Sequence, residues 1–195
     1  MNCNSLTPEE SLLLITRTIE ETKDRFKQNG HIFIFWGTLV FAVNMSQLIL
    51  SLLHYYKFTM IPVLLYPLGA IFSFIYFRNQ DKKNHRPKTM IGNILARLGG
   101  VIGLNLMVMG FFFSNQLGEA MAPVFIILLA LFIILSGTSI QFKPLIIGGA
   151  ILNLIGLGTF FLARDYHGFS MMLGSVVGLI IPGILLNKAR SKENV

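Results

Sequence analysis

Six long apolar runs follow one another along the chain and are separated by short polar connections. A helix that crosses a bilayer needs about 20 apolar residues, so each run predicts one transmembrane helix. The short connections favour antiparallel neighbours in a bundle. The predicted spans are residues 31–54, 58–77, 90–113, 121–140, 144–163 and 169–187. The sequence therefore predicts an all-α fold, a polytopic transmembrane helical bundle of six spans that together form one domain over residues 31–187.

Residues 1–30 precede this domain and have a different pattern. Thr7, Pro8 and Glu10 are typical of a helix start, with a capping box and proline in the first turn. Residues then repeat at spacings of three and four along one helical face: Leu12, Ile15, Ile19, Thr22 and Phe26. We therefore expect an amphipathic cytoplasmic or interfacial helix over residues 7–29. Its charges nearly balance, whereas helices that bind anionic lipid are usually basic, so docking on lipid and docking on protein both stay open.

The composition excludes an ordinary soluble protein and a disordered one. Hydrophobic residues make up 53% of the chain and charged residues only 13%, against about 25% charge in a typical soluble domain. The single cysteine, Cys3, excludes an intramolecular disulfide. The net charge of +7 lies beside the apolar runs and no nucleic-acid recognition motif is present, so we do not expect nucleic acid as a partner.

The positions of the basic residues predict the orientation, because cytoplasmic segments are enriched in Lys and Arg. If the N-terminus lies inside, the outer segments carry only Lys57 and Arg164. The inner segments then carry Arg17, Lys23, Arg25, Lys27, Arg78, Lys82, Lys83, Arg86, Lys88, Lys143, Lys188, Arg190 and Lys192. Both termini are therefore expected in the cytoplasm, with residues 188–195 as a basic cytoplasmic tail.

Polar side chains within the predicted spans are expected to face the bundle interior, because hydrocarbon solvates them poorly. The candidate polar interior consists of Asn44, Gln47, Ser51, Tyr66, Ser73, Asn93, Arg97, Asn105 and Asn153. One interpretation is that these residues form hydrogen bonds between helices. The alternative is that they line a cavity for a small ligand.

Arg97 is the charged residue that lies well inside a predicted span. Its long side chain can either snorkel to the cytoplasmic headgroups or bind an anionic group inside the bundle. We expect the guanidinium to point inward near Asn93 and the inner end of the first span, beside a wet pocket open to the cytoplasm.

Glycines on the third and sixth spans predict close helix packing. The candidate packing residues are Gly92, Gly99, Gly103, Gly110, Gly174 and Gly178. Gly99 and Gly103 are expected to touch another helix backbone, so Gly103→Leu should overpack. Pro67 and Pro182 lie inside predicted spans and are expected to kink them.

The predicted spans contain no Asp or Glu, and the chain has no motif for nucleotide binding, metal binding or a nucleophilic serine. We therefore expect no metal and no cofactor. The favoured function is non-enzymatic, through the lipid bilayer and a protein partner or self-association. An uncoupled carrier or channel for a small or amphiphilic solute is the alternative, and an intramembrane enzyme ranks last. Trp36, Tyr55 and Tyr56 are typical of interfacial aromatic belts.

The stretch from Glu10 to Phe41 combines an amphipathic ESLLLITRTIEETKDRFKQNG with a following HIFIFWGTLVF. In this pattern, which includes Gly30 and the pair Trp36 and Gly37, the chain resembles an uncharacterised family of small bacterial membrane proteins. The likeness continues loosely over all six spans. The resemblance implies a bacterial inner-membrane location and a six-span plan, without an assigned activity.

Overall fold

A computed structural model describes residues 7, 9, 12–14, 16, 30–83 and 90–193. Within these residues the regular structure is entirely helical, which confirms the all-α prediction at this level. The amphipathic helix expected over residues 7–29 lies almost wholly outside the described residues and stays a prediction.

The long helices follow the predicted apolar runs. Their bounds are α2 (Gly30–Leu52), α3 (Leu65–Lys83), α4 (Met90–Phe112), α6 (Met121–Ser139), α7 (Lys143–Thr159), α8 (His167–Ser175) and α9 (Ile181–Glu193). Short helical turns join them: η1 (Tyr56–Phe58), η2 (Pro62–Leu64), α5 (Ser114–Leu117), η3 (Gly118–Ala120) and η4 (Arg164–Tyr166). Five helical segments among the described residues are long and apolar enough to cross a membrane, and the 17-residue α7 is apolar but shorter.

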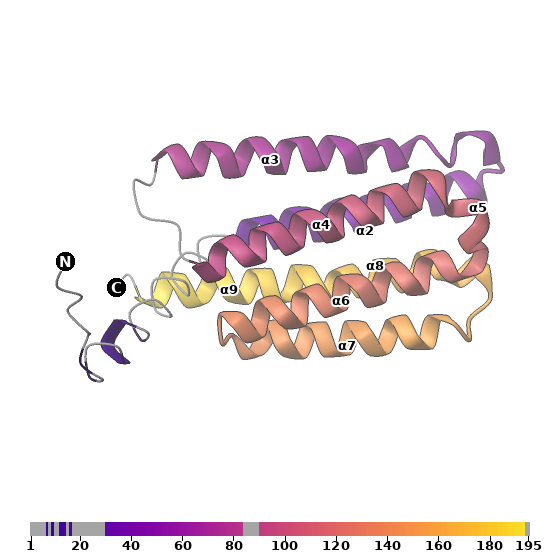
Figure 1. Ribbon diagram of the computed structural model, residues 1–195. Coiled ribbons are helices and arrows are strands. Elements are labelled where there is room, and N and C mark those ends of the chain that lie inside the picture. The colour runs from indigo at the N-terminus through magenta and orange to yellow at the C-terminus, as the bar shows by residue number, and fades with distance from the viewer. Residues whose placement is uncertain are drawn as a thin grey trace.

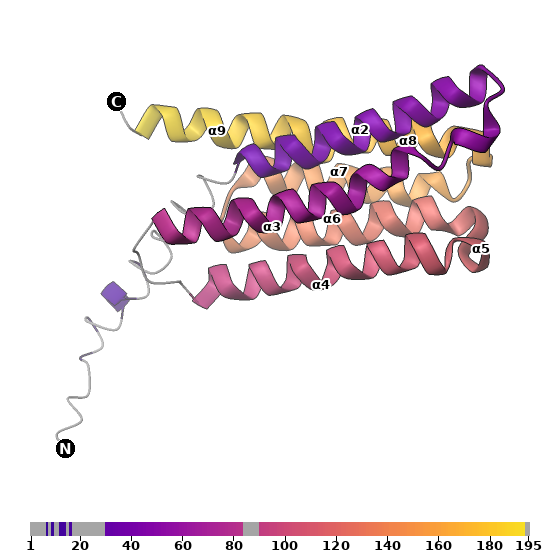
Figure 2. The same ribbon diagram turned by 90° about the horizontal axis from the view of Figure 1, so that it is seen from above.

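These long helices run side by side, and the chain turns back at each end of the bundle (Figures 1 and 2). The start of α2, the end of α3, the end of α6 and the end of α9 lie at one end. The connections from α2 to α3, from α4 to α6 and from α7 to α8 lie at the other. The arrangement is that of an antiparallel helical bundle.

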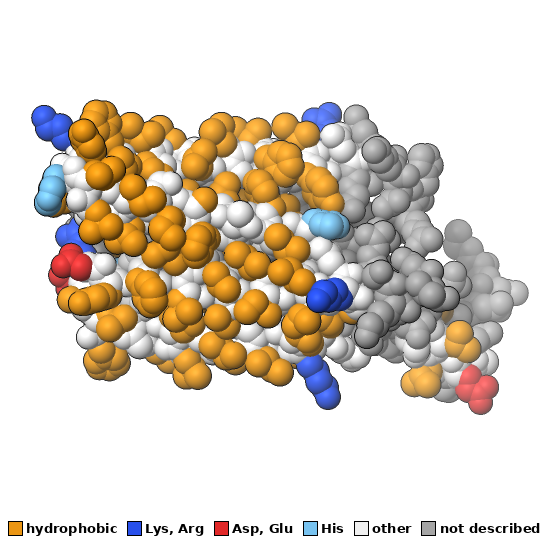
Figure 3. Space-filling model, turned by 180° about the vertical axis from the view of Figure 1, so that it is seen from behind, with side chains coloured by type: hydrophobic (Ala, Val, Ile, Leu, Met, Phe, Trp, Pro, Cys, Tyr) orange, Lys and Arg blue, Asp and Glu red, His pale blue; other side chains and the backbone are white. Residues whose placement is uncertain are grey.

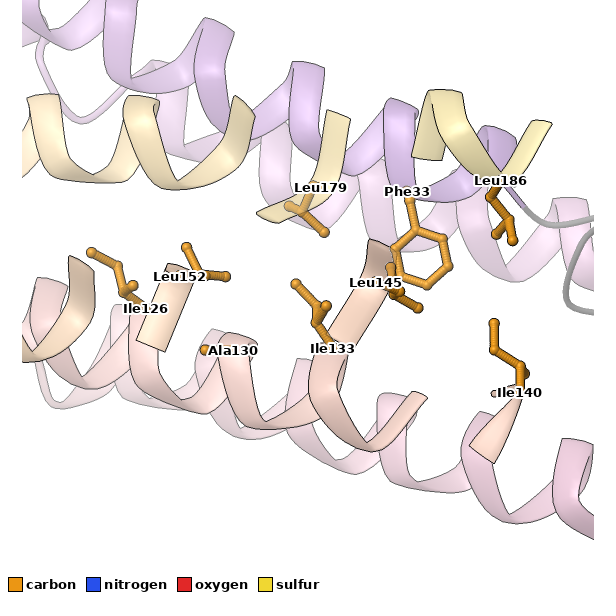
Figure 4. Close-up of a cluster of buried hydrophobic side chains, with 9 residues drawn as sticks. All are labelled: Phe33, Ile126, Ala130, Ile133, Ile140, Leu145, Leu152, Leu179 and Leu186. Atoms are coloured by element: carbon orange, nitrogen blue, oxygen red, sulfur yellow. The ribbon is translucent and has the colours of Figure 1, made fainter. Parts of the chain in front are cut away.

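The core lies between α2, α6, α7 and the continuous C-terminal helical segment formed by α8, η5 (Val176–Ile180) and α9. Nine buried apolar side chains fill it, and Figure 4 shows them pointing toward one another: Phe33, Ile126, Ala130, Ile133, Ile140, Leu145, Leu152, Leu179 and Leu186. Helices packed within a bilayer are stabilised by close van der Waals contact rather than by escape from water. This interdigitated cluster therefore stabilises the packing of these four helical segments.

By contrast, α3 and α4 are peripheral. In the most apolar stretch of Arg164–Ala189, 50% is buried inside the structure. The buried share of the corresponding stretch is only 6% in Asn93–Phe112 and 11% in Tyr56–Tyr76. The outer faces of α3 and α4 are consequently open to whatever surrounds the molecule.

The two interior prolines behave differently. The expectation of a kink at Pro67 is wrong, because α3 begins only at Leu65, after two short turns, and Pro67 falls in its first turn. There the missing N–H has no intrahelical partner to lose. Near Pro182 the helix does change: Val176–Ile180 forms a π-helical turn, η5, directly before α9. A wider turn accommodates the proline ring where an α-helix would bring it against the carbonyl four residues earlier.

Candidate polar seam between α2 and α3

Several of the polar residues predicted to face the bundle interior on the first two spans do lie opposite each other. The indole N–H of Trp36 donates to the hydroxyl of Ser73 at 3.0 Å. Two turns further along α2, the amide of Asn44 donates to the hydroxyl of Tyr66 at 3.5 Å and to its own helix at Val40. Because α2 and α3 are antiparallel, the two pairs stack along one line, which we call the polar seam.

The seam continues to the connection between the two helices. The amide of Gln47 donates to the backbone carbonyl of Thr59 at 3.1 Å, which ties α2 to the turn before α3. Ser51 is half-buried one turn further on. These bonds satisfy polar groups that would otherwise be unpaired in an apolar environment. The seam thus has the geometry of interhelical hydrogen bonding.

The sequence does not predict the hydrogen bonds of two side chains in this region, Trp36 and His167. Trp36 was expected in an interfacial belt, yet its N–H is turned to Ser73 on the neighbouring helix. His167 is buried at the start of α8, and its Nε2–H donates to the carbonyl of Leu162 at 3.1 Å. A methyl group added at the adjacent Gly168 would lie 4.0 Å from Oδ1 of Asn44, so α8 reaches the seam. An apolar run in the sequence does not indicate which polar side chains form hydrogen bonds at the start of a helix. The hydrogen bond from His167 to Leu162 could therefore not be predicted from the sequence.

The polar residues of α4 are not part of the seam. Asn93 is half-buried, Arg97 and Asn105 are exposed, and the Asn105 amide donates to the carbonyl of Val101 on its own helix. α4 packs through Gly99, and at about 100° per residue Arg97 lies about 160° around the helix from that contact. The expectation that Arg97 points into the bundle is therefore wrong: the glycine face turns toward α6 and carries the polar face outward.

Among the remaining candidates, Asn153 is half-buried on α7. It lies between Gly149 and Gly156, which pack against α6. The seam accordingly contains Asn44, Gln47, Tyr66 and Ser73 of the candidate residues, and not Asn93, Arg97, Asn105 or Asn153. Within the described part of the chain, no group of three or more His, Cys, Asp and Glu side chains could hold a metal ion.

The glycine predictions have mixed outcomes. A methyl group added at Gly99 would lie 2.9 Å from the ring of Phe132, and one at Gly110 would lie 3.5 Å from Phe125, so both glycines accommodate α6 side chains rather than backbone. Nothing lies within 4 Å of a methyl group at Gly103. The predicted backbone contact at Gly103 is therefore wrong for the described part of the chain, where Gly103→Leu has no neighbour to overpack. Gly92 lies in the first turn of α4.

The predicted packing glycines of the sixth span, Gly174 and Gly178, do pack against another helix. Methyl groups at Gly174 and Gly178 would lie 2.6 and 2.7 Å from the side chain of Leu152 on α7, so these glycines form the hollow that Leu152 fills. Close approaches to the backbone of another helix occur at other glycines. A methyl group at Gly149 would lie 3.0 Å from the backbone nitrogen of Ile134. A methyl group at Gly183 would lie 3.1 Å from the carbonyl oxygen of Gly30.

No family model, no curated protein and no solved structure matches this chain. The fold defines it as a helical bundle with several helices suited to a membrane. Five apolar helices of spanning length suggest an integral, multi-pass membrane protein.

Proposed function

We propose that this chain is a six-span protein of the bacterial inner membrane that acts without catalysis, through protein or lipid partners in the plane of the membrane. The observation that carries this proposal is the contrast between a closed apolar core and the open faces of α3 and α4. A protein that uses its lateral surface needs such faces, and its core serves as a rigid support. The bacterial inner-membrane location rests on the resemblance of residues 10–41.

The length of α7 supports a sixth span. Its 17 residues extend about 26 Å at 1.5 Å per residue, close to the roughly 30 Å hydrocarbon thickness of a bilayer. It also packs along α6 (Figure 1). Since α6 is one of the helices of spanning length, this packing supports a transmembrane position for α7 as well.

The distribution of charge supports cytoplasmic termini. An apolar belt covers the face in Figure 3, and charged side chains lie toward its two ends. At the end that holds the connections α2–α3, α4–α6 and α7–α8, the described charges cancel: Lys57 and Arg164 against Glu119 and Asp165. At the opposite end, the end of α3, the start of α7 and the end of α9 carry a net positive charge, which the positive-inside rule associates with a cytoplasmic side. The cations there are Arg78, Lys82, Lys83, Lys143, Lys188, Arg190 and Lys192, and the acids are Asp81 and Glu193.

The polar seam is the observation that favours the alternative function, an uncoupled carrier or channel. Side chains of α2 and α3 with free hydrogen-bonding capacity would suit the wall of a solute path. In the seam, however, Trp36 pairs with Ser73 and Asn44 pairs with Tyr66, so the polar groups bond to each other. We therefore propose that the seam is dry and structural.

Water access to the seam tests this choice. Cys3→Ser provides a background without cysteine, into which Asn44→Cys, Ser73→Cys and the exposed control Lys57→Cys are introduced singly. We expect a membrane-impermeant maleimide to label Lys57→Cys and to leave the two seam cysteines unlabelled in intact membranes. Labelling of Asn44→Cys and Ser73→Cys at a rate similar to the control would overturn the proposal in favour of the carrier.

A further inference from the structure

Among the described residues, Arg97 has no partner, and it lies on an apolar surface of α4. It lies four residues, about 6 Å, inside the span Asn93–Phe112. Its side chain is exposed and makes no hydrogen bond or ion pair among the described residues. A charge at this depth in hydrocarbon is costly unless it reaches the headgroups or meets a counter-charge. Whatever occupies this face must therefore supply an anionic group near the cytoplasmic boundary.

The surface below Arg97 is open and smooth. Gly100, Val101 and Leu104 follow Arg97 by three, four and seven residues, so all four residues share one face of α4. Nothing lies within 4 Å of a methyl group at Gly100, and Val101 and Leu104 are 57% and 63% exposed. We call these four residues the α4 outer strip: a cation above an apolar track that no other part of the described chain covers.

We infer that the α4 outer strip binds an anionic phospholipid of the cytoplasmic leaflet, with its phosphate on Arg97 and an acyl chain along Gly100, Val101 and Leu104. A guanidinium presents a planar fork of donors that matches a phosphate in bidentate geometry. The track below has the apolar character of the chain that hangs from that phosphate. This inference rests on the proposed membrane embedding and orientation, and it names the class of one partner.

Charge complementarity favours lipid over a second copy of the chain. The predicted spans contain no Asp or Glu, so a copy inserted in the same direction offers no intramembrane carboxylate at this depth. Glu119 and Asp165 lie in connections at the opposite end of the bundle, and Asp81 and Glu193 lie at the ends of α3 and α9, beyond the apolar segments Tyr56–Tyr76 and Arg164–Ala189. Lysines are adjacent to both of these acids, so a second copy presents a net cationic surface at this end. The negative surface of a bacterial cytoplasmic leaflet supplies the missing charge at the level that a snorkelling arginine reaches.

Native mass spectrometry of the full chain tests the inference. The protein in detergent is titrated with phosphatidylglycerol, and the dissociation constant of the tightest lipid site is compared among the wild type, Arg97→Gln, Arg97→Lys and the control Arg78→Gln. Arg78 is exposed on α3 beyond the apolar stretch, at the same end of the bundle. Thermal unfolding of each variant establishes that the fold is kept.

We expect Arg97→Gln to weaken phosphatidylglycerol binding about tenfold or more, because a charge-assisted hydrogen bond contributes that much. Arg97→Lys should fall between Arg97→Gln and the wild type, and Arg78→Gln should bind like the wild type. Phosphatidylcholine should bind the wild type more weakly than phosphatidylglycerol. Millimolar inorganic phosphate should not displace the lipid.

Three results would overturn the inference: equal lipid affinity in Arg97→Gln and the wild type, displacement of lipid by inorganic phosphate, or loss of a dimeric species in Arg97→Gln with lipid affinity unchanged. The last would make Arg97 a protein contact. Each of these leaves the proposed function standing, because span count and seam access are measured separately by cysteine labelling.

Discussion

At the scale of single residues, the seam shows how a sequence pattern becomes a contact. Because hydrocarbon solvates polar groups poorly, Asn44, Tyr66 and Ser73 are predicted to face the bundle interior, and in the structure they form hydrogen bonds between α2 and α3. The same reasoning failed for Arg97. Periodicity gives the angles between residues on one helix, but the side that packs is decided by the neighbour, here Phe132 against Gly99.

The hydrogen bond between Trp36 and Ser73 should be a modest contributor to stability. Hydrogen bonds between membrane helices average about 0.6 kcal/mol in double-mutant cycles. We expect Trp36→Phe and Ser73→Ala each to lower the free energy of unfolding in detergent, with a coupling energy of about 0.6 kcal/mol between them. The four-member cycle measures that coupling. Strict additivity of the two changes would show that the pair contributes nothing.

At the scale of elements, the apolar runs predicted where the long helices lie, because continuous apolarity over this length leaves few alternatives to a helix. The residues at which a helix starts and ends depend instead on the local sequence. α3 begins seven residues later than the predicted span at 58, since the preceding residues form η1 and η2. The π turn before Pro182 could be expected only as an unspecified kink, because its form depends on the packing of Pro182 against Gly148.

Two glycines, one on α7 and one on α4, should respond in opposite ways to the same substitution. In Gly149→Ala the new methyl group would lie 2.8 Å from the Ile134 side chain and 3.0 Å from its backbone nitrogen. Overpacking of this kind costs about 1–3 kcal/mol. Gly103→Ala enters open space and should be neutral or stabilising by up to about 1 kcal/mol, since alanine favours helix.

Thermal or denaturant unfolding of the two variants in detergent checks this contrast. Gly100→Ala, which also meets nothing within 4 Å, serves as a second control on α4. A loss of stability in Gly103→Ala comparable to that in Gly149→Ala would show that Gly103 is covered in the functional assembly.

At the scale of the whole molecule, composition alone predicted a helical membrane bundle, because so few charges are spread over so many apolar residues. It could not predict which helices form the core. All six runs are predominantly apolar, and the few polar residues within them do not indicate how deeply a helix is buried in the bundle. The division into a closed core and the peripheral α3 and α4 depends on side-chain fit, such as Leu152 in the hollow at Gly174 and Gly178.

A topology of six spans with both ends in the cytoplasm depends most on whether α7 crosses the membrane. Lys143 at its start and Arg164 just beyond its end bracket this helix. Lys143→Cys and Arg164→Cys, each in the Cys3→Ser background, are labelled with an impermeant maleimide in intact cells and again after permeabilisation. We predict that Arg164→Cys is labelled in intact cells and Lys143→Cys only after permeabilisation. Labelling of both from the same side would contradict the six-span account.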